Sequence, residues 1–313
     1  MELIRGLHNL QARHQGCVAT IGNFDGVHLG HQAVLGQLAE KADELCLPAT
    51  VITFEPQPQE YFAPEKAPAR LTKFREKLQA LRRFSVDRLF CLSFNRHLAA
   101  MTADEFIQRV LVNGLGVRYL VVGDDFRFGH GRKGDFATLR SAGRQQGFDV
   151  VHMHTFEVKG ERVSSTRIRQ TLTAGDMQAA AHLLGRDYRM SGRVAHGAKL
   201  GRQLGYPTAN IYLHRKVSPL QGIFVVEVFG LAGEPLPGVA SLGTRPTVDG
   251  SHVLLEVFLF DFNKDIYGEH LQVSFLHKLR DEMRFDSLDT LKLKIQQDVD
   301  EAKDFFARQK ASI

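Results

Sequence analysis

The sequence has few cysteines and no long apolar run, and both shortages limit what the chain can be. Its 313 residues include three cysteines, Cys17, Cys46 and Cys91, which form no metal-spaced pair and each lie in an apolar stretch. We therefore expect reduced, buried thiols in a cytoplasmic protein. No stretch approaches the ~18 apolar residues of a membrane span, and no apolar segment follows the first residues. Neither secretion nor membrane insertion is expected.

Basic blocks and two well-known nucleotide motifs are also missing. The formal net charge is +5, but basic residues are interleaved with acidic ones and never form a run of five. This pattern favours solvated faces over a nucleic-acid surface. The lack of a Gly-x-x-x-x-Gly-Lys-Ser/Thr run excludes a P-loop kinase. The Lys-x-Asp-Gly motif of nucleotidyl ligases is missing too, so a covalent nucleotidyl intermediate is not expected.

With 43% hydrophobic residues, the chain is long enough for two domains, which we place at residues 1–184 and 187–313. In the first, short β-branched runs alternate with helical patterns, which predicts an α/β fold with a parallel sheet. A capping box at Thr102 and Glu105 predicts a helix that ends near Val112. Long polar loops are expected at 55–70 and 124–133, a helix at 31–46, and strands at 17–21, 49–54, 88–92, 117–123 and 148–152.

The second half has apolar runs separated by glycine and proline, which predicts a small antiparallel β-barrel. Its expected strands are 189–196, 222–229, 239–242, 252–262 and 271–276. A terminal helix beginning near Ser287 carries one apolar stripe, which we expect to pack on the barrel. Binding of a partner is the alternative for this stripe. Its residues are Leu288, Leu291, Ile295, Val299, Ala302 and Phe306.

A glycine-punctuated turn with two histidines links the first predicted strand to its helix. Backbone N–H groups at a helix N-terminus carry partial positive charge, so this turn is a place for a nucleotide's phosphates, with His28 and His31 as added donors. Glycines there permit close backbone approach and positive φ. A metal site is the alternative, but no further ligand follows at a suitable spacing. The candidate contacts are Gly22, Asn23, Phe24, Asp25, Gly26 and Gly30.

Two more segments of the first half suit a nucleotide and a planar ring. Residues 164–169 place hydroxyls at a helix start and arginines just inside it, where they can cap the helix or bind phosphate. The loop 124–129 combines acidic, aromatic and basic groups, and its rings can stack on a ligand or belong to the core. The candidates are Ser164, Ser165, Thr166, Arg167 and Arg169, and Phe54, Asp125, Phe126, Arg127 and Phe128.

The segment 192–211 is the strongest signal of the second half. Its closely spaced glycines allow the backbone to wrap around phosphates, and two basic residues add charge. Thr208 and Asn210 offer oxygen ligands of the kind that Mg²⁺ takes beside a nucleotide. The remaining candidates here are Gly192, Gly197, Lys199, Gly201, Arg202 and Gly205.

These segments together resemble the bacterial bifunctional riboflavin kinase/FAD synthetase family. Residues 22–31, 124–129 and 164–169 look like its adenylyltransferase module, which has a Rossmann-like nucleotidylyltransferase fold, and 192–211, with Pro-Thr-Ala-Asn at 207–210, looks like its kinase module. The likeness continues to the segment that begins at Leu276. The sequence departs from the family's pattern at two positions: Phe224 stands where tyrosine is frequent, and Phe258 stands where histidine is frequent. These departures affect details of flavin or nucleotide contact.

The resemblance implies that residues 187–313 phosphorylate riboflavin to FMN and that residues 1–184 adenylylate FMN to FAD and release pyrophosphate. Both steps would use ATP and Mg²⁺. His28, His31, Ser165 and Arg169 would donate to the phosphates, and Glu256 would be the kinase's general base. Further contacts are implied at His196, Pro207, Arg280 and Glu282. No nucleic-acid or membrane partner is expected, and homo-oligomer formation is left open.

Two other functions fit parts of the sequence. A nucleotidylyltransferase for another acceptor, with an accessory barrel, fits the first half but has no use for the segment 192–210. An RNA-binding barrel fits the positive charge but needs aromatics interleaved with Lys and Arg on its sheet, and the runs 224–229 and 253–260 are too apolar for that.

Overall fold

The structure is a computed structural model that describes residues 1–123, 125–153, 156–158, 160–197, 201, 204–215, 217–247 and 250–311. The backbone divides into two compact units: residues 1–68 with 72–164, and residues 69–71 with 165–313. The domain limits 1–184 and 187–313 stay a prediction. No helix among the described residues has both the length and the apolar character needed to cross a membrane.

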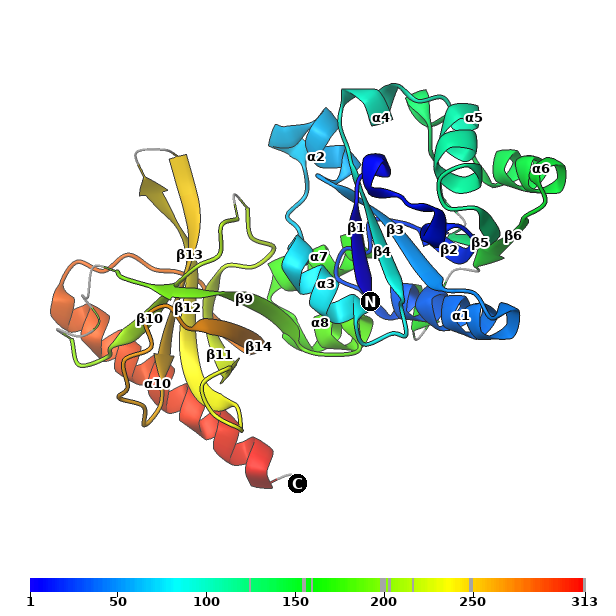
Figure 1. Ribbon diagram of the computed structural model, residues 1–313. Coiled ribbons are helices and arrows are strands. Elements are labelled where there is room, and N and C mark those ends of the chain that lie inside the picture. The colour runs from blue at the N-terminus through cyan, green and yellow to red at the C-terminus, as the bar shows by residue number, and fades with distance from the viewer. Residues whose placement is uncertain are drawn as a thin grey trace. The chain divides into compact units, whose positions relative to one another are not determined.

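A six-stranded parallel sheet forms the centre of the first unit, in the order β1-β4-β3-β2-β5-β6 (Figure 1). The predicted α/β fold is confirmed. The edge strand β1 was not predicted, because four residues give too short a pattern to recognise. The strands are β1 (Glu2–Arg5), β2 (Cys17–Ile21), β3 (Ala49–Glu55), β4 (Arg88–Ser93), β5 (Val117–Gly123) and β6 (Asp149–Met153), followed by a small hairpin of β7 (Glu157–Val158) and β8 (Glu161–Arg162).

Helices follow most of these strands: α1 (Leu29–Leu45), α2 (Pro58–Phe62), α3 (Phe74–Leu81), α4 (Arg96–Ala100), α5 (Ala103–Phe106) and α6 (Phe136–Gln146). The capping box is confirmed, since Thr102 accepts the N–H of Glu105 at 3.1 Å and the Glu105 carboxylate accepts that of Thr102 at 2.8 Å. The predicted end at Val112 is also right, although the turns Ile107–Val112 form a π-helix. The expected loop 55–70 contains α2 and a 3-10 turn, Pro64–Lys66.

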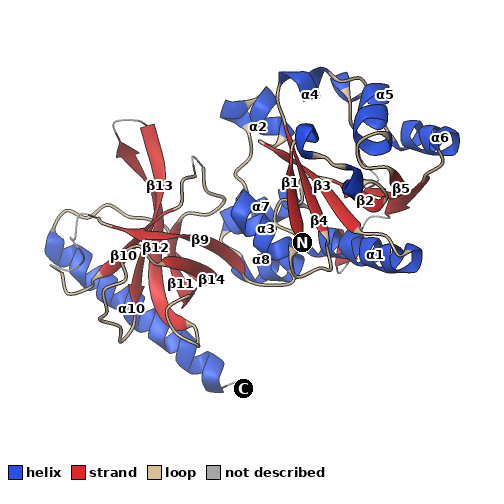
Figure 2. Cartoon of the chain, in the orientation of Figure 1, coloured by secondary structure: helices blue, strands red, loops and turns tan. Residues whose placement is uncertain are grey.

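Alternating residues of the parallel strands serve two separate cores on the two faces of the sheet. On β2, Val18 packs with α1 and α3, whereas Cys17 and Ala19 pack with α5, the π-helix and α6 (Figure 2). Cys17 and Cys91 are buried as expected. The expectation is wrong for Cys46, which is exposed because it ends α1 in a left-handed conformation with φ 52°.

The second unit begins with α7 (Ser165–Ala174) and α8 (Met177–Leu184) and continues into a closed antiparallel barrel of order β10-β13-β12-β11-β14-β9. The predicted barrel is confirmed, but β10 was not predicted as a strand. The barrel strands are β9 (Tyr188–Ala195), β10 (Thr208–Tyr212), β11 (Gly222–Phe229), β12 (Leu236–Thr247), β13 (Gly250–Leu259) and β14 (His270–Arg280).

The terminal helix α10 (Leu288–Ala311) runs along the barrel, as Figure 1 shows. Its Val299 and Ala302 are buried against the barrel, and Ile295 and Phe306 pack beside them, so the predicted packing is confirmed there. The prediction is wrong for the first residue of the stripe, Leu288, which is 57% exposed. This residue lies in the first turn of α10, before the part of the helix that packs on the barrel.

Candidate active sites

The two histidines of the first candidate site meet at the N-terminus of the 17-residue helix α1. His28 is the N-cap, and its Nδ1 accepts the backbone N–H of His31 at 3.3 Å. The two rings stack with their centroids 3.6 Å apart. An accepting Nδ1 carries no proton, so the donor of the His28 ring is Nε2. The strand, the turn and the helix start therefore bring both imidazoles to one helix end, as the sequence predicts.

Backbone conformation within the turn differs from the expectation. Positive φ is found at Gly26 (87°) but not at Gly22 or Gly30, and the residues Phe24 (47°) and Val27 (42°) adopt it instead. A Cβ at position 30 would lie 3.3 Å from the His28 ring, which is a tight contact. A left-handed backbone conformation at a residue other than glycine costs about 1–3 kcal/mol, and it persists only where the surrounding structure holds it in place.

A buried hydrogen-bonded clamp holds this turn. One carboxylate oxygen of Asp25 accepts the backbone N–H of Thr72 at 2.9 Å and the Thr72 hydroxyl at 3.2 Å. The same hydroxyl accepts the N–H of Gly26 at 3.0 Å. Asp25 and Thr72 are buried, so these bonds are shielded from water. Asp25, which was predicted to contact the nucleotide, thus fixes the shape of the turn.

His31 lies in an environment that disfavours its charged form. Burial, the neighbouring His28 and the ammonium of Lys77 together hold the pKa of His31 well below its ordinary value. Its Nδ1 is buried and has no hydrogen-bond partner in the described part of the chain. The ring is therefore neutral at ordinary pH, with one nitrogen left for a ligand.

Two exposed ion pairs join the predicted ring-binding loop to neighbouring residues. Arg127 donates to Asp135 at 2.8 Å, and Arg162 donates to Asp125 at 2.7 Å. The rings of Phe126 and Phe128 stack at 5.6 Å, and Phe128 is buried in the core. Asp124 lies outside the described residues.

The serine and arginine segment is split between the two units. Ser164 belongs to the first unit, and α7, which begins at Ser165 as predicted, belongs to the second. Within the second unit, Nε of Arg169 donates to the carbonyl of Ala69 at 2.6 Å. Thr166 is exposed, and Arg167 is half-buried.

The second candidate site lies on the barrel. Asn210 on β10 pairs with Glu256 on β13, and Glu256 pairs with Ser241 on β12. Directly paired residues of antiparallel strands share one face, and Thr208 lies two residues from Asn210 on that same face. The flanking Leu255 and Val257 are buried inside. Thr208, Asn210 and Glu256 therefore share the outer face of the barrel. An outward-facing Glu256 agrees with the alternation of residues along its strand.

Two glycines before β10 allow a close approach of the backbone. A Cβ at Gly197 would collide with the Asn210 side chain, and one at Gly201 would collide with the carbonyl of Tyr206. Gly205 has φ 90° and leads into Pro207 and β10, while Gly192 lies within β9. The ring of His196 lies 4.0 Å from that of Tyr267. Lys199 and Arg202 lie outside the described residues.

The implied contacts Arg280, at the end of β14, and Glu282, just after it, have different surroundings. Arg280 forms a mostly buried, two-pronged ion pair with Asp298 of α10, with N–O distances of 2.8 and 2.6 Å. The Glu282 carboxylate lies where a Cβ of Gly243 would stand. Arg280 thus joins the barrel to α10, and its role in ligand binding stays a prediction.

Comparison with known proteins shows the family of this chain. Residues 10–167 match the family model for FAD synthetase, and residues 184–306 match that for riboflavin kinase. The chain is 53% identical over 307 residues to the bifunctional riboflavin kinase/FMN adenylyltransferase of Escherichia coli strain K12, covering 98% of each chain. The protein of that name from Haemophilus influenzae is 52% identical over 306 residues, covering 98% of this chain and 99% of its own. The chain belongs to the bifunctional riboflavin kinase/FMN adenylyltransferase family.

A solved structure shares the fold of this family member. It is described as a macrolide-efflux protein from Streptococcus pneumoniae, is 32% identical, and superposes with a TM-score of 0.81. The match covers 95% of this chain and 97% of that one. The same sequence of elements thus occurs along nearly the full length of both chains.

Two features of the adenylyltransferase-like unit were missed by the sequence analysis. Tyr61 and Phe62 of α2 pack edge-on against Phe94, which also contacts Phe54, and Phe62 is 66% exposed. Tyr61 and Phe62 were missed because they belong to a segment that was predicted to be a loop. Lys77, by contrast, is fully buried on α3. Its position between the apolar residues Phe74 and Leu81, three and four residues away, was the available signal.

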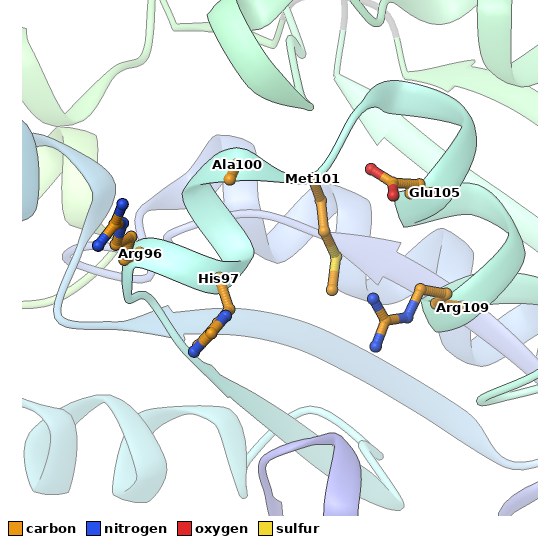
Figure 3. Close-up of a pocket in the computed structure, with 6 residues that line it drawn as sticks. All are labelled: Arg96, His97, Ala100, Met101, Glu105 and Arg109. Atoms are coloured by element: carbon orange, nitrogen blue, oxygen red, sulfur yellow. The ribbon is translucent and has the colours of Figure 1, made fainter.

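A cavity of about 530 Å³ lies elsewhere in the first unit (Figure 3). Its lining comes from α4, α5 and the π-helix and contains none of the predicted site residues. Glu105 is already engaged in the capping box of α5. The lining residues are Arg96, His97, Ala100, Met101, Glu105 and Arg109.

Proposed function

We propose that this chain phosphorylates riboflavin to FMN with ATP and then adenylylates FMN to FAD with a second ATP, releasing pyrophosphate. The observation that carries the proposal is the presence of two separate phosphate-site geometries, the histidine pair at α1 and the Thr208, Asn210 and Glu256 face of the barrel, in a member of this family. The proposed partners are the small molecules riboflavin, FMN and ATP, in the cytoplasm.

In the kinase step, Glu256 accepts the proton of the ribityl 5′-hydroxyl as that oxygen attacks the γ-phosphorus of ATP, and the bond from the γ-phosphorus to the bridging oxygen breaks as ADP leaves. A positioned base contributes roughly 10²- to 10⁴-fold in rate. The hydroxyl of Thr208 and the amide oxygen of Asn210 fit Mg²⁺, which prefers oxygen ligands and which, when bound, neutralises charge on the phosphates. The glycine segment, with Lys199 and Arg202, binds the phosphate oxygens.

In the adenylyl step, an oxygen of the FMN phosphate attacks the α-phosphorus of ATP, and the bond to the β-phosphate breaks as pyrophosphate leaves. The protein's task is to position these groups and neutralise their charge. His28 donates through Nε2, and His31 and the N–H groups at the start of α1 add further donors. The exposed rings of Tyr61 and Phe62 suit a planar flavin ring.

The test follows the flavins by chromatography after the pure protein is mixed with riboflavin and Mg-ATP. We expect transient FMN followed by FAD. The double variant His28→Ala/His31→Ala should stop at FMN, whereas Glu256→Gln should leave riboflavin unchanged but still convert supplied FMN to FAD. Matched controls are the exposed His8→Ala and Glu234→Gln. Normal FAD formation by the histidine variant would overturn the assignment of the first site, and FMN formation at the native rate by Glu256→Gln that of the second.

A further inference from the structure

Lys77 is a charged side chain with no exposed surface. Its Nζ lies 3.5 Å from the hydroxyl oxygen of Thr53 on β3, and Thr53 is also fully buried. Removing an ammonium from water costs several kcal/mol even after the protein relaxes around it. A buried lysine between a helix and a sheet is therefore a feature whose position calls for a function.

The clamp at Thr72 sets where this ammonium lies. Helix α3 begins at Phe74, two residues after Thr72, and Thr72 is bonded to both Asp25 and Gly26 of the histidine turn. The start of α3 is thus tied to the turn by bonds that are shielded from water. Lys77 lies about one turn further along α3, so the clamp that fixes the start of the helix also fixes the position of Lys77.

The positive charge of Lys77 acts on the ring of His31. Among the described residues, two titratable groups act on the His31 ring: His28, stacked at 3.6 Å, and Lys77 from α3. Phe24 packs against the same ring at 4.9 Å and is uncharged. Nδ1 of His31 is buried without a hydrogen-bond partner in the described structure, so this ring has a polar atom left for a ligand.

We propose that Lys77 is a positioning residue of the adenylyl-transfer site: its buried charge, held against β3 on the helix that the clamp ties to the turn, adds positive potential where that turn binds the nucleotide's phosphates and acts on the His31 ring. The inference rests on the proposed function of that turn. A charge held in place away from water acts more strongly than one in solvent, and it needs no reorganisation as negative charge develops during transfer. Lys77 acts through His31 and the local potential and does not itself touch the reacting atoms.

The test compares Lys77→Met, which removes the charge at similar length, with Lys77→Arg, which keeps it. The control Arg75→Met removes an exposed charge from the same helix. We expect Lys77→Met to lose about tenfold or more in kcat/KM for FMN adenylylation, and the phosphorylation of riboflavin to stay native. Lys77→Arg should recover most of the loss, and Arg75→Met should be native in both reactions.

A second readout separates charge from packing. In ¹⁵N-histidine NMR spectra, with the His31 signals identified by their loss in His31→Gln, the ring should begin to titrate at higher pH in Lys77→Met than in the native protein. Circular dichroism checks that each variant keeps the native fold, and the rates are compared only between folded variants. Lys77→Gln offers the same comparison with a polar group beside Thr53.

Three results would decide against the proposal. Native kcat/KM in folded Lys77→Met would overturn it, and so would a His31 titration that superimposes on the native curve. Equal losses in folded Lys77→Met and Lys77→Arg would assign the effect to packing. Failure of the native protein itself to convert FMN to FAD is a different outcome, since it would overturn the proposed function of the turn.

Discussion

The Nδ1 atom of His28 caps helix α1, while Nε2 carries the donor that we assign to phosphate. One side chain thus supports the helix and serves the site, and a change to alanine removes both. Loss of an N-cap costs about 0.5–2 kcal/mol. His28→Asn, which keeps a capping acceptor, is therefore the better variant for separating lost binding from lost structure.

His31 should make the first unit sensitive to mild acid. Its pKa lies well below the ordinary value of 6.5 in the folded chain. Below about pH 6.5 the unfolded chain therefore binds a proton that the folded chain does not, and the free energy of unfolding falls as the pH drops further. Above that pH this group has no effect. Urea unfolding gives the free energy of unfolding at pH 5.5 and at pH 7.5. The difference between these two values should be smaller for His31→Gln than for the native protein, and equal differences would contradict the expectation.

Residue-level prediction from sequence failed where burial reverses the usual preference of a side chain. Lysine is almost never fully buried, so Lys77 looks like a surface residue of α3 until the fold places it against β3. The histidine turn was recognisable because its residue types are unusual for an ordinary turn. Its clamp was not, since Asp25 and Thr72 are 47 positions apart and meet only in the folded chain.

At the scale of elements, a mostly buried ion pair joins α10 to the barrel. Asp298→Ala would leave the Arg280 guanidinium without its carboxylate at the end of β14. We expect the free energy of unfolding of the second unit to fall by about 3–5 kcal/mol. Urea unfolding measures this change, with Asp304→Ala, an exposed charge on the same helix, as control. A loss no greater than that of the control would show that the pair contributes nothing net.

Elements were predictable from sequence where both faces of a strand are buried. The central strands of the parallel sheet were placed within about two residues, because such strands are nearly continuous apolar runs. Strand β10 was missed because its face with Thr208 and Asn210 is polar. The polarity that marks the site therefore conceals the strand that carries it.

At the scale of the whole molecule, each proposed reaction has its own principal site, the histidine turn in the first unit and the barrel face in the second. FMN made at one site is a substrate for the other. A mixture of His28→Ala/His31→Ala with Glu256→Gln should therefore form FAD from riboflavin, at a rate that rises with protein concentration, because FMN diffuses between molecules. Accumulation of FMN without FAD in this mixture would show that FMN must pass within one chain.

Closure of the barrel has a consequence for synthesis on the ribosome. Strand β9 is the first barrel strand to emerge, yet one of its two neighbours is β14, the last. The strands of the first sheet have all been made once residue 153 is added, whereas one edge of β9 stays unpaired until residues 270–280 follow. An open strand edge is a template for pairing with other chains. The nascent barrel is therefore open to misassembly for longer than the first sheet, and α10, which follows β14 in the chain, is made only after the strand that closes this edge.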